Sequence, residues 1–258
     1  MQLEESPTMN KAKATEREAV IVVSNLSIAF GDNQVLDDFN LTLYKGENLA
    51  VLGKSGSGKS VLIKCIIGLL KPSAGNIRVL GKNVPTLKQD ELDELRVKVG
   101  FLFQSNALYD SMTVRENLEF PLRRHGKNLT QNEIDALVIE ALENVGLAHT
   151  VDMMPIELSG GMRKRIALAR TLILKPEIIL YDEPTTGLDP FTSKEISLLM
   201  VEIQKKYNTS SLIITHDMNC VRRTADWIAI LLHGKCHAEG TVTHLQHAED
   251  EAIKQFFE

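Results

Sequence analysis

A glycine-rich run in the first quarter of the chain constrains its fold more than any other segment. The run is Gly53-Lys54-Ser55-Gly56-Ser57-Gly58-Lys59-Ser60, and it fits the pattern G-x-x-x-x-G-K-[ST] at every position. Short apolar segments, 48–52 and 61–63, flank it on both sides. Glycines of such a loop let successive N–H groups turn toward phosphate oxygens. The sequence therefore predicts an α/β fold in which this loop joins a buried strand to a helix and binds a nucleotide.

The residues after the glycines have distinct chemical roles in this prediction. A helix predicted over 59–69 points its N-terminus, with a partial positive charge, at the phosphates. Lys59 adds a cation at the β- and γ-phosphates, and the Ser60 hydroxyl ligates Mg²⁺. A Gly/Ser linker is the alternative, but the apolar segments on both sides of the loop disfavour it.

Two carboxylates follow a second apolar run, 178–181. Adjacent strand residues point to opposite faces, so Asp182 and Glu183 can have different tasks. Asp182 is predicted to complete the Mg²⁺ shell, and Glu183 to polarise water for in-line attack on a γ-phosphate. An ordinary charged strand end is the alternative, which the complete phosphate loop upstream disfavours.

Composition and patterning indicate how the rest of the chain is organised. The 258 residues are 43% hydrophobic, and the net charge of −5 argues against a nucleic-acid partner. The runs 178–181, 212–215 and 227–232 are typical of a parallel sheet covered on both faces. Segments 20–30 and 35–44 favour antiparallel strands, whereas 105–174 is helical in character. Residues 1–19 are expected to be a flexible tail, and either Met1 or Met9 can be the true start.

Targeting signals and disulfides are not expected. No stretch of about 20 apolar residues is visible, and the N-terminus does not resemble a secretory signal. The three cysteines, Cys65, Cys220 and Cys236, are too few and too widely spaced for a disulfide framework. The predicted compartment is the cytosol.

A further motif connects the chain to a known family. Leu158-Ser159-Gly160-Gly161-Met162, followed by Arg163-Lys164-Arg165, resembles the signature of ATP-binding cassette (ABC) ATPases, which usually has Gln in place of Met162. Physically, it is a second small anion site, with a hydroxyl, two glycine N–H groups and a helix N-terminus. The resemblance runs from about residue 20 to at least residue 240.

The resemblance assigns roles to four more residues. Phe30 resembles the aromatic platform for adenine, with a core phenylalanine as the alternative. Gln104 resembles the glutamine that senses Mg²⁺ and the attacking water. Asp189 resembles a residue of the loop that crosses between two ATPase copies. His216 resembles the switch histidine at the γ-phosphate, with a structural histidine as the alternative.

The resemblance also implies an architecture and a partner. It implies that residues 20–258 form a single ABC ATPase domain with an antiparallel β subdomain and a helical subdomain, about 105–174, inserted in the α/β core. In this family the phosphate loop of one copy faces the signature of another. Because this chain has one of each, ATP is expected to lie between two copies.

The segment 103–114, with Asn117 and 121–123, resembles the MlaF-type ATPases of Mce-associated lipid transport. This resemblance implies ATP-driven phospholipid transport between bacterial membranes. It also implies a permease resembling MlaE, an Mce-domain lipid-binding protein and, in some members, a small STAS-domain protein, with the ATPase on the cytoplasmic face of the inner membrane. The alternative is an importer ATPase for a small polar solute such as an amino acid. A soluble, non-transport ABC ATPase is less favoured, because those usually carry two cassettes in one chain.

Two surface features complete the expectations. An apolar segment, Ala107, Leu108, Tyr109, Met112 and Leu118, is expected to form a groove for a cytoplasmic helix of the permease, with Tyr109 as anchor. Core packing of some of these residues is the alternative. The histidines and cysteine between 233 and 247 match no metal pattern, and the run 163–165 is interpreted as a solvated helix face.

Overall fold

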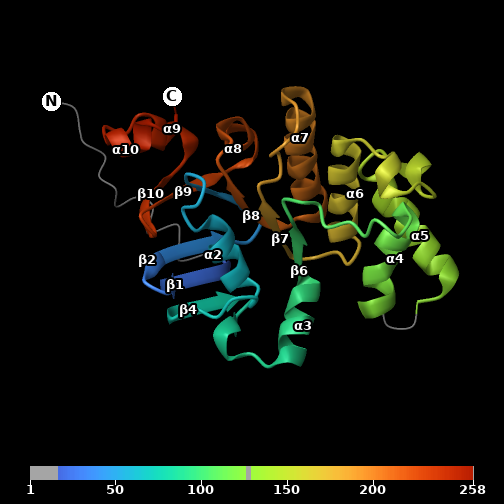
Figure 1. Cartoon of the computed structure of the whole chain (residues 1–258), viewed down its shortest axis with the longest axis horizontal. Helices are drawn as coiled ribbons and strands as arrows, with labels where there is room; N and C mark the ends of the chain where they lie inside the picture. Colours follow the sequence, from blue (N-terminus) through green and yellow to red (C-terminus); the bar gives the residue numbers. More distant parts are fainter. Residues whose placement is uncertain (1–16, 126–128, 258) are drawn as a thin grey trace.

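A computed structural model of the chain describes residues 17–125 and 129–257 (Figure 1). Most of the expected N-terminal tail therefore lies outside the described residues. The strands are β1 (Ala19–Phe30), β2 (Asn33–Tyr44), β3 (Asn48–Leu52), β4 (Ala74–Val79), β5 (Lys82–Asn83), β6 (Val99–Leu102), β7 (Ile178–Asp182), β8 (Ser210–Thr215), β9 (Trp227–Leu232) and β10 (Lys235–Gly240). The helices are α2 (Lys59–Ile66), α3 (Gln89–Lys98), α4 (Val114–His125), α5 (Gln131–Glu143), α6 (Gly160–Leu172), α7 (Pro190–Tyr207), α8 (Met218–Thr224), α9 (Val242–Gln246) and α10 (Glu251–Lys254), with short 3₁₀ turns η2 (Val84–Thr86), η3 (Ala148–Thr150) and η4 (Pro155–Glu157).

A six-stranded sheet forms the centre of the described chain, in the order β10-β9-β3-β8-β7-β6. Neighbouring strands from β9 to β6 are parallel, and only β10 runs antiparallel to its neighbour. The apolar runs predicted as parallel strands are β7, β8 and β9, so that prediction is confirmed. Because these strands are parallel, the residues that follow β3, β6, β7 and β8 meet at one edge of the sheet.

Alternating residues of the central strands enter different hydrophobic cores. In β7, Ile178 and Leu180 pack in a core shared with β1, β2 and α2, whereas Ile179 and Tyr181 pack against the helices α4 to α7. In β3, Leu49 and Val51 join the first core, and Ala50 and Leu52 join a third core with α8, α9 and α10. Both faces of the sheet are therefore covered, which explains why the strands carry continuous apolar runs.

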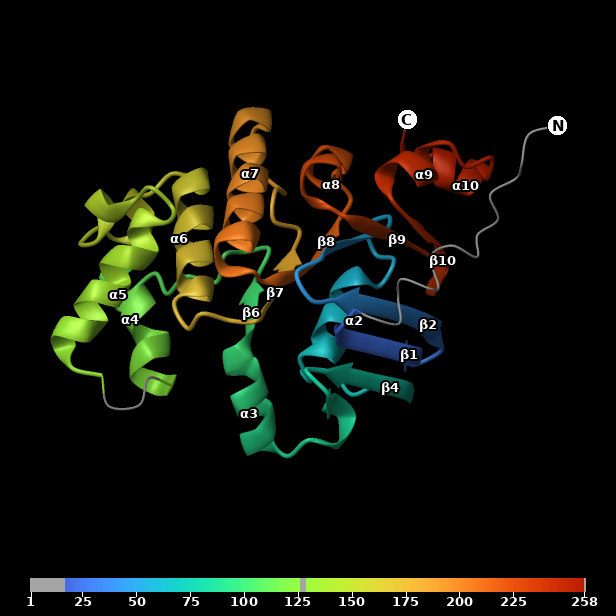
Figure 2. The ribbon, with the colours of Figure 1, turned by 180° about the vertical axis from the view of Figure 1, so that it is seen from behind.

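A separate antiparallel sheet packs beside α2, in the order β2-β1-β4-β5. The predicted pairing of the first two strands is confirmed, with Val23 opposite Leu41 in their register. The described elements between β6 and β7 are all helical, and α4, α5 and α6 lie at the opposite end of the molecule from β1, β2 and β4 in both views (Figure 2).

A capping box marks the start of α5. Thr130 and Glu133 form it, since each side chain bonds the other residue's main-chain N–H. The helix predicted over 59–69 is shorter than expected, however, because α2 ends at Ile66 and Gly68 follows with φ 68°. A left-handed glycine directly after the last turn commonly ends a helix.

Helix α7 has 18 residues, and polar residues occur along much of its length. Among residues 17–125 and 129–257, no helix has the length and apolar character needed to cross a membrane.

Candidate nucleotide site

The glycine-rich loop connects the buried strand β3 to α2, as predicted. Gly58, directly before α2, has φ 103°, and a Cβ placed there would lie 2.9 Å from Cγ1 of Val35. No other residue type fits both this conformation and this contact. The Lys59 side chain folds back over the loop, where its Nζ donates to the main-chain oxygens of Gly53 at 2.7 Å and Lys54 at 3.2 Å.

The hydroxyl of Ser60 and the carboxylate of Asp182 lie side by side. Ser60 Oγ donates to Asp182 Oδ1 at 3.2 Å, which joins the start of α2 to the end of β7. Burial of the Asp182 carboxyl group raises its pKa, while the bond from Ser60 opposes that shift. Two oxygen donors at the phosphate end of the loop are the kind of ligands that Mg²⁺ prefers.

Glu183 is the most heavily contacted carboxylate of the site. Its Oε1 lies 3.4 Å from Nζ of Lys59, and its Oε2 lies 2.9 Å from Nδ1 of His216. The hydroxyls of Thr186 and Thr215 also donate to Oε2, each at 3.2 Å. Glu183 has φ 48°, a strained conformation for a glutamate. Strain of this kind is concentrated at functional sites, where surrounding contacts hold it.

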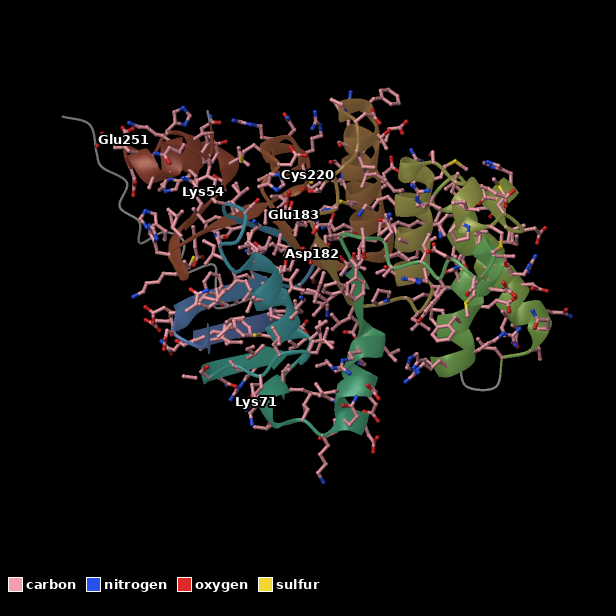
Figure 3. The ribbon with its side chains drawn as sticks, viewed as in Figure 1. Lys54, Lys71, Asp182, Glu183, Cys220 and Glu251 are labelled. Carbon is pink, nitrogen blue, oxygen red and sulfur yellow. The ribbon has the colours of Figure 1, made fainter. Side chains whose placement is uncertain are left out.

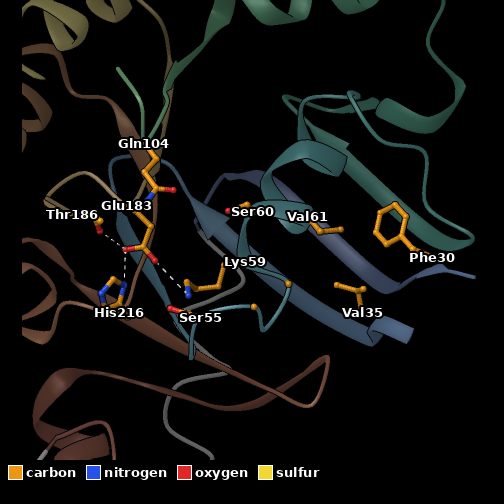
Figure 4. Close-up of a pocket in the computed structure, with 12 residues that line it drawn as sticks. Phe30, Val35, Ser55, Lys59, Ser60, Val61, Gln104, Glu183, Thr186 and His216 are labelled. Atoms are coloured by element: carbon orange, nitrogen blue, oxygen red, sulfur yellow. Dashed lines mark hydrogen bonds and ion pairs between the residues drawn. The ribbon is translucent and has the colours of Figure 1, made fainter. Parts of the chain in front are cut away.

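Lys59, Ser60, Glu183, Thr186 and His216 line one open cavity of about 480 Å³ (Figure 4). Of the residues predicted to bind or act on the nucleotide, the cavity contains Phe30, Ser55, Gly56, Gly58, Lys59, Ser60, Gln104, Glu183 and His216. Figure 3 shows Asp182 and Glu183 near the middle of the molecule, where the central strands end. The volume is within the range of small-molecule sites.

Phe30 lies at the opposite end of this cavity from Glu183 (Figure 4). It is the last residue of β1, and 49% of its surface is exposed. The alternative that Phe30 is a core residue is therefore wrong. An exposed ring on the wall of a cavity is free to stack on a flat ligand.

Four of the remaining predicted residues occupy a second region, at the N-termini of α6 and α7. The others, Gly53, Lys54, Ser57 and Asp182, belong to the loop and to the end of β7, and Lys54 and Ser57 line a neighbouring cavity. Ser159 caps α6 by accepting a bond from the main-chain N–H of Met162 at 3.2 Å, and Asp189 caps α7. A Cβ on Gly161 would lie 2.6 Å from Cγ2 of Thr192, so the two helix starts pack closely. Ser159, Gly160, Gly161 and Asp189 do not line the cavity described above.

The interpretation of the run 163–165 as a solvated helix face is wrong. Lys164 is only 2% exposed, and its Nζ donates to the main-chain oxygen of Gln104 at 3.0 Å. Arg163 bonds the oxygen of Leu158, and Arg165 pairs with Glu195. The helical turn places Lys164 against the loop after β6, and burial lowers the pKa of its ammonium group to about 8.

Several residues of the site were missed from the sequence. Thr186 and Thr215 bond Glu183, and Val35 and Val61 line the cavity. Their positions gave a partial signal, because Thr186 lies three residues after Glu183 and Thr215 directly before His216. The valines gave none, because they resemble ordinary core residues.

The polar cluster near the C-terminus has local partners. Nε2 of His237 lies 2.7 Å from Oδ2 of Asp250, which joins β10 to the start of α10. Among the residues that the structure describes, no three His, Cys, Asp or Glu side chains are grouped so that they can hold a metal ion.

Comparison with known proteins shows which family this chain is similar to. Residues 36–186 match a family described as ABC transporter. Over 237 residues the chain is 40% identical to the intermembrane phospholipid transport system ATP-binding protein MlaF of Haemophilus influenzae, which covers 92% of this chain and 89% of that protein.

Two further relatives are longer than this chain. The probable ribonucleotide transport ATP-binding protein mkl of Mycobacterium tuberculosis is 40% identical over 236 residues, covering 92% of this chain and 66% of that protein. The methionine import ATP-binding protein MetN 2 of Rhodopseudomonas palustris is 39% identical over 246 residues, covering 95% of this chain and 65% of that protein.

The fold also matches a solved structure. The dimeric post-hydrolysis state of the ATP-binding cassette MJ0796, bound to ADP and Pi, superposes with a TM-score of 0.79 at 31% identity. The match covers 86% of this chain and 98% of that one.

Proposed function

This chain belongs to the ABC transporter family as an ATP-hydrolysing subunit, and we propose that the transport it powers is that of phospholipid between bacterial membranes. Its fold is that of an ABC ATPase, as predicted from the motifs. The observation that carries the proposal is the 40% identity to MlaF along nearly the full length of both proteins. The segment 103–114, which led to the same group from the sequence, supports it.

An amino-acid importer is the second candidate. The match to MetN 2 at 39% identity favours it, although this chain covers only 65% of that protein. Met162 argues against it, because importer ATPases of that class usually have Gln at this position of the signature. In this chain Met162 is half-buried at the start of α6 and packs against the core of the helical insertion.

The test is transport by the assembled complex. We expect the complex, isolated from its host's membranes through a tag on this chain and placed in liposomes, to transfer a labelled phospholipid only with ATP. Labelled methionine measured in the same liposomes is the matched comparison. ATP-dependent methionine uptake without lipid transfer would replace the lipid proposal with the importer.

We propose the following division of roles in ATP binding. Lys59 neutralises the β- and γ-phosphates, and the loop N–H groups cradle their oxygens. Ser60 and Asp182, which are already in contact, fit a Mg²⁺ site, and Gln104 lines the same cavity as Ser60. One carboxylate ligand suits this ion, since Mg²⁺ sites are usually completed by water and phosphate oxygens. When bound, the ion neutralises charge on the phosphates.

Glu183 is proposed as the general base for the attacking water. Its carboxylate faces the cavity beside Lys59, where the γ-phosphate end of the nucleotide is expected. Hydrogen bonds from Thr186 and Thr215 to Oε2 fix the orientation of this carboxylate, and the His216 ring contacts the same oxygen. A base held in place needs little reorganisation before proton transfer.

A second copy of the chain is proposed to complete the site. The signature region and Asp189 lie outside the cavity, so one copy cannot place them on the nucleotide in its own phosphate loop. The matching cassette MJ0796 is dimeric in its solved structure. Two copies arranged head to tail would bring Ser159 to Gly161 of each onto the nucleotide held by the other.

Phe30 is proposed to stack on the adenine ring. We expect Phe30→Ala to weaken ATP binding by about 1 kcal/mol, the usual value of an aromatic stacking contact. Fluorescence titration with ATP measures the loss. Inorganic triphosphate, which has no base, is the control ligand, and its affinity should change little. Unchanged ATP affinity in a folded variant would remove Phe30 from the adenine site.

Exposed aromatic side chains after β6 are proposed to contact the permease on the cytoplasmic side of the inner membrane. Tyr109 is 43% exposed, and its ring centroid lies 5.1 Å from that of Phe120, which is also exposed. Ala107 is exposed, while Leu108 and Met112 are half-buried. The expectation that Leu118 lines the groove is wrong, because its side chain is fully buried in the core beneath α4.

We expect Tyr109→Ala to leave the chain folded and able to bind ATP, but to reduce its co-purification with the permease or uncouple ATP hydrolysis from lipid transfer. The physical reason is the loss of a large, pre-positioned aromatic contact. Tyr109→Phe, which keeps the ring, is the matched control. Normal assembly and normal lipid transfer by the alanine variant would remove Tyr109 from the interface.

A further inference from the structure

The loop between β6 and α4 is held by two side chains of α6 at its main-chain oxygens. Lys164 Nζ donates to Gln104 O at 3.0 Å, and Arg170 Nη2 donates to Asn106 O at 3.3 Å. Thr171 of the same helix instead bonds Phe101 O within β6 and Ala167 O within α6. Two side chains of one helix therefore hold the segment that presents Gln104 to the cavity.

This segment has a backbone that needs such support. Asn106 and Ala107 are consecutive residues with φ 65° and 52°, a conformation that residues with a Cβ rarely adopt. Two strained residues in sequence persist only where surrounding contacts hold them. The side chain of Asn117 adds to this support by bonding both the N–H and the oxygen of Tyr109.

Burial of the Lys164 ammonium group carries the largest desolvation cost among the side chains that hold this loop. Its side chain is 2% exposed, and within the described chain no carboxylate oxygen lies within 4.0 Å of its ammonium. A buried ammonium without a carboxylate in direct contact is expensive, and its charge-assisted bond to the Gln104 carbonyl is the contact that offsets this cost. Asp182 acts on the same ammonium group only at longer range. A methionine of the same length would fill this space at less cost.

The position of Lys164 along α6 gives this bond a further consequence. Lys164 lies five residues after Ser159, whose side chain caps the helix at the signature. The N-terminus of α6 and the carbonyl of Gln104 are therefore joined through about one turn of helix and one side chain. A displacement of the N-terminus of α6 would therefore move the main chain of Gln104 through this hydrogen bond.

We propose that Lys164 is a positioning residue for Gln104, tying the loop that reaches the nucleotide site to the signature end of α6. The inference rests on the proposed role of Gln104 at that site. Lys164 does not touch the nucleotide itself; it acts through the main chain of Gln104. When the helix start engages the nucleotide of a second copy, this bond carries the change to the Gln104 side chain.

Steady-state ATP hydrolysis by the full-length chain in its membrane complex tests the proposal. We expect Lys164→Met to lower kcat about tenfold, since small misplacements at an active site are costly, while KM for ATP changes less than about twofold. Lys164→Arg, which keeps a charged donor, should recover most of the loss. Thr171→Val is the matched control on the same helix and should leave kcat unchanged.

A double-variant cycle separates positioning from general packing. In a Gln104→Ala background, Lys164→Met should cause no further loss of kcat, because both changes remove the same contribution. An equal loss in both backgrounds, or no loss in either, would overturn the proposal. A normal kcat for Gln104→Ala alone would instead refute the role of Gln104, which is a distinct result.

Hydrogen exchange gives a measurement that does not depend on catalysis. Amides of the segment 103–109 should exchange at least about fivefold faster in Lys164→Met than in the parent chain, and at the parent rate in Thr171→Val. Unchanged exchange in the methionine variant would show that Lys164 does not hold the loop. If Lys164→Met does not fold, Lys164→Leu, which also lacks a donor, takes its place in the cycle.

Discussion

Glu183→Gln is expected to retain ATP binding while turnover falls by roughly 10²- to 10⁴-fold, the usual contribution of a general base. The amide matches the carboxylate in size, and its oxygen can still accept bonds from Thr186 and Thr215. It cannot take a proton from water. Nucleotide titration and steady-state hydrolysis by the purified complex measure the two effects separately.

The same substitution should change the assembly of the protein. With hydrolysis blocked, ATP is expected to hold two copies together, which light scattering detects as a doubling of mass for the isolated chain. Glu177→Gln is the matched control. Glu177 directly precedes β7, at the opposite end of that strand from Glu183, and it is exposed and paired with Lys98. Normal hydrolysis by Glu183→Gln would place the base on another residue.

The parts of the fold that could be predicted are those encoded by neighbouring residues. The phosphate loop lies between β3 and α2 because its glycines and apolar flanks permit few other conformations. The parallel strands were recognisable because β7 and β8 are buried on both faces and so cannot alternate with polar residues. Once strands are parallel, Gln104, Glu183 and His216 must meet at one edge.

The parts that could not be predicted depend on contacts between distant segments. Lys164 resembles a surface residue in sequence, yet α6 packs its side chain against the loop after β6. Leu118 resembles the other apolar residues of its segment, such as the exposed Tyr109, yet the turn of α4 directs it inward. Neither outcome follows from periodicity alone, because a basic run and a short apolar run each permit more than one orientation of the helix.

Lys59→Ala is expected to abolish ATP hydrolysis and to weaken ATP binding strongly. The ammonium is the cation that lies inside the phosphate loop, and it also contacts Glu183, so its loss removes phosphate neutralisation and disturbs the base. Its loss also leaves the oxygens of Gly53 and Lys54 without this donor. We expect a stability loss of about 1 to 3 kcal/mol from that cause.

Thermal unfolding must therefore accompany the hydrolysis assay for this variant. Lys59→Met keeps the apolar stem of the side chain and should be more stable than Lys59→Ala but equally inactive, because neither supplies a charge. Lys64→Ala is the control, since Lys64 lies on the same helix and is exposed to solvent. Substantial hydrolysis by folded Lys59→Met would show that the loop does not use this ammonium at the γ-phosphate.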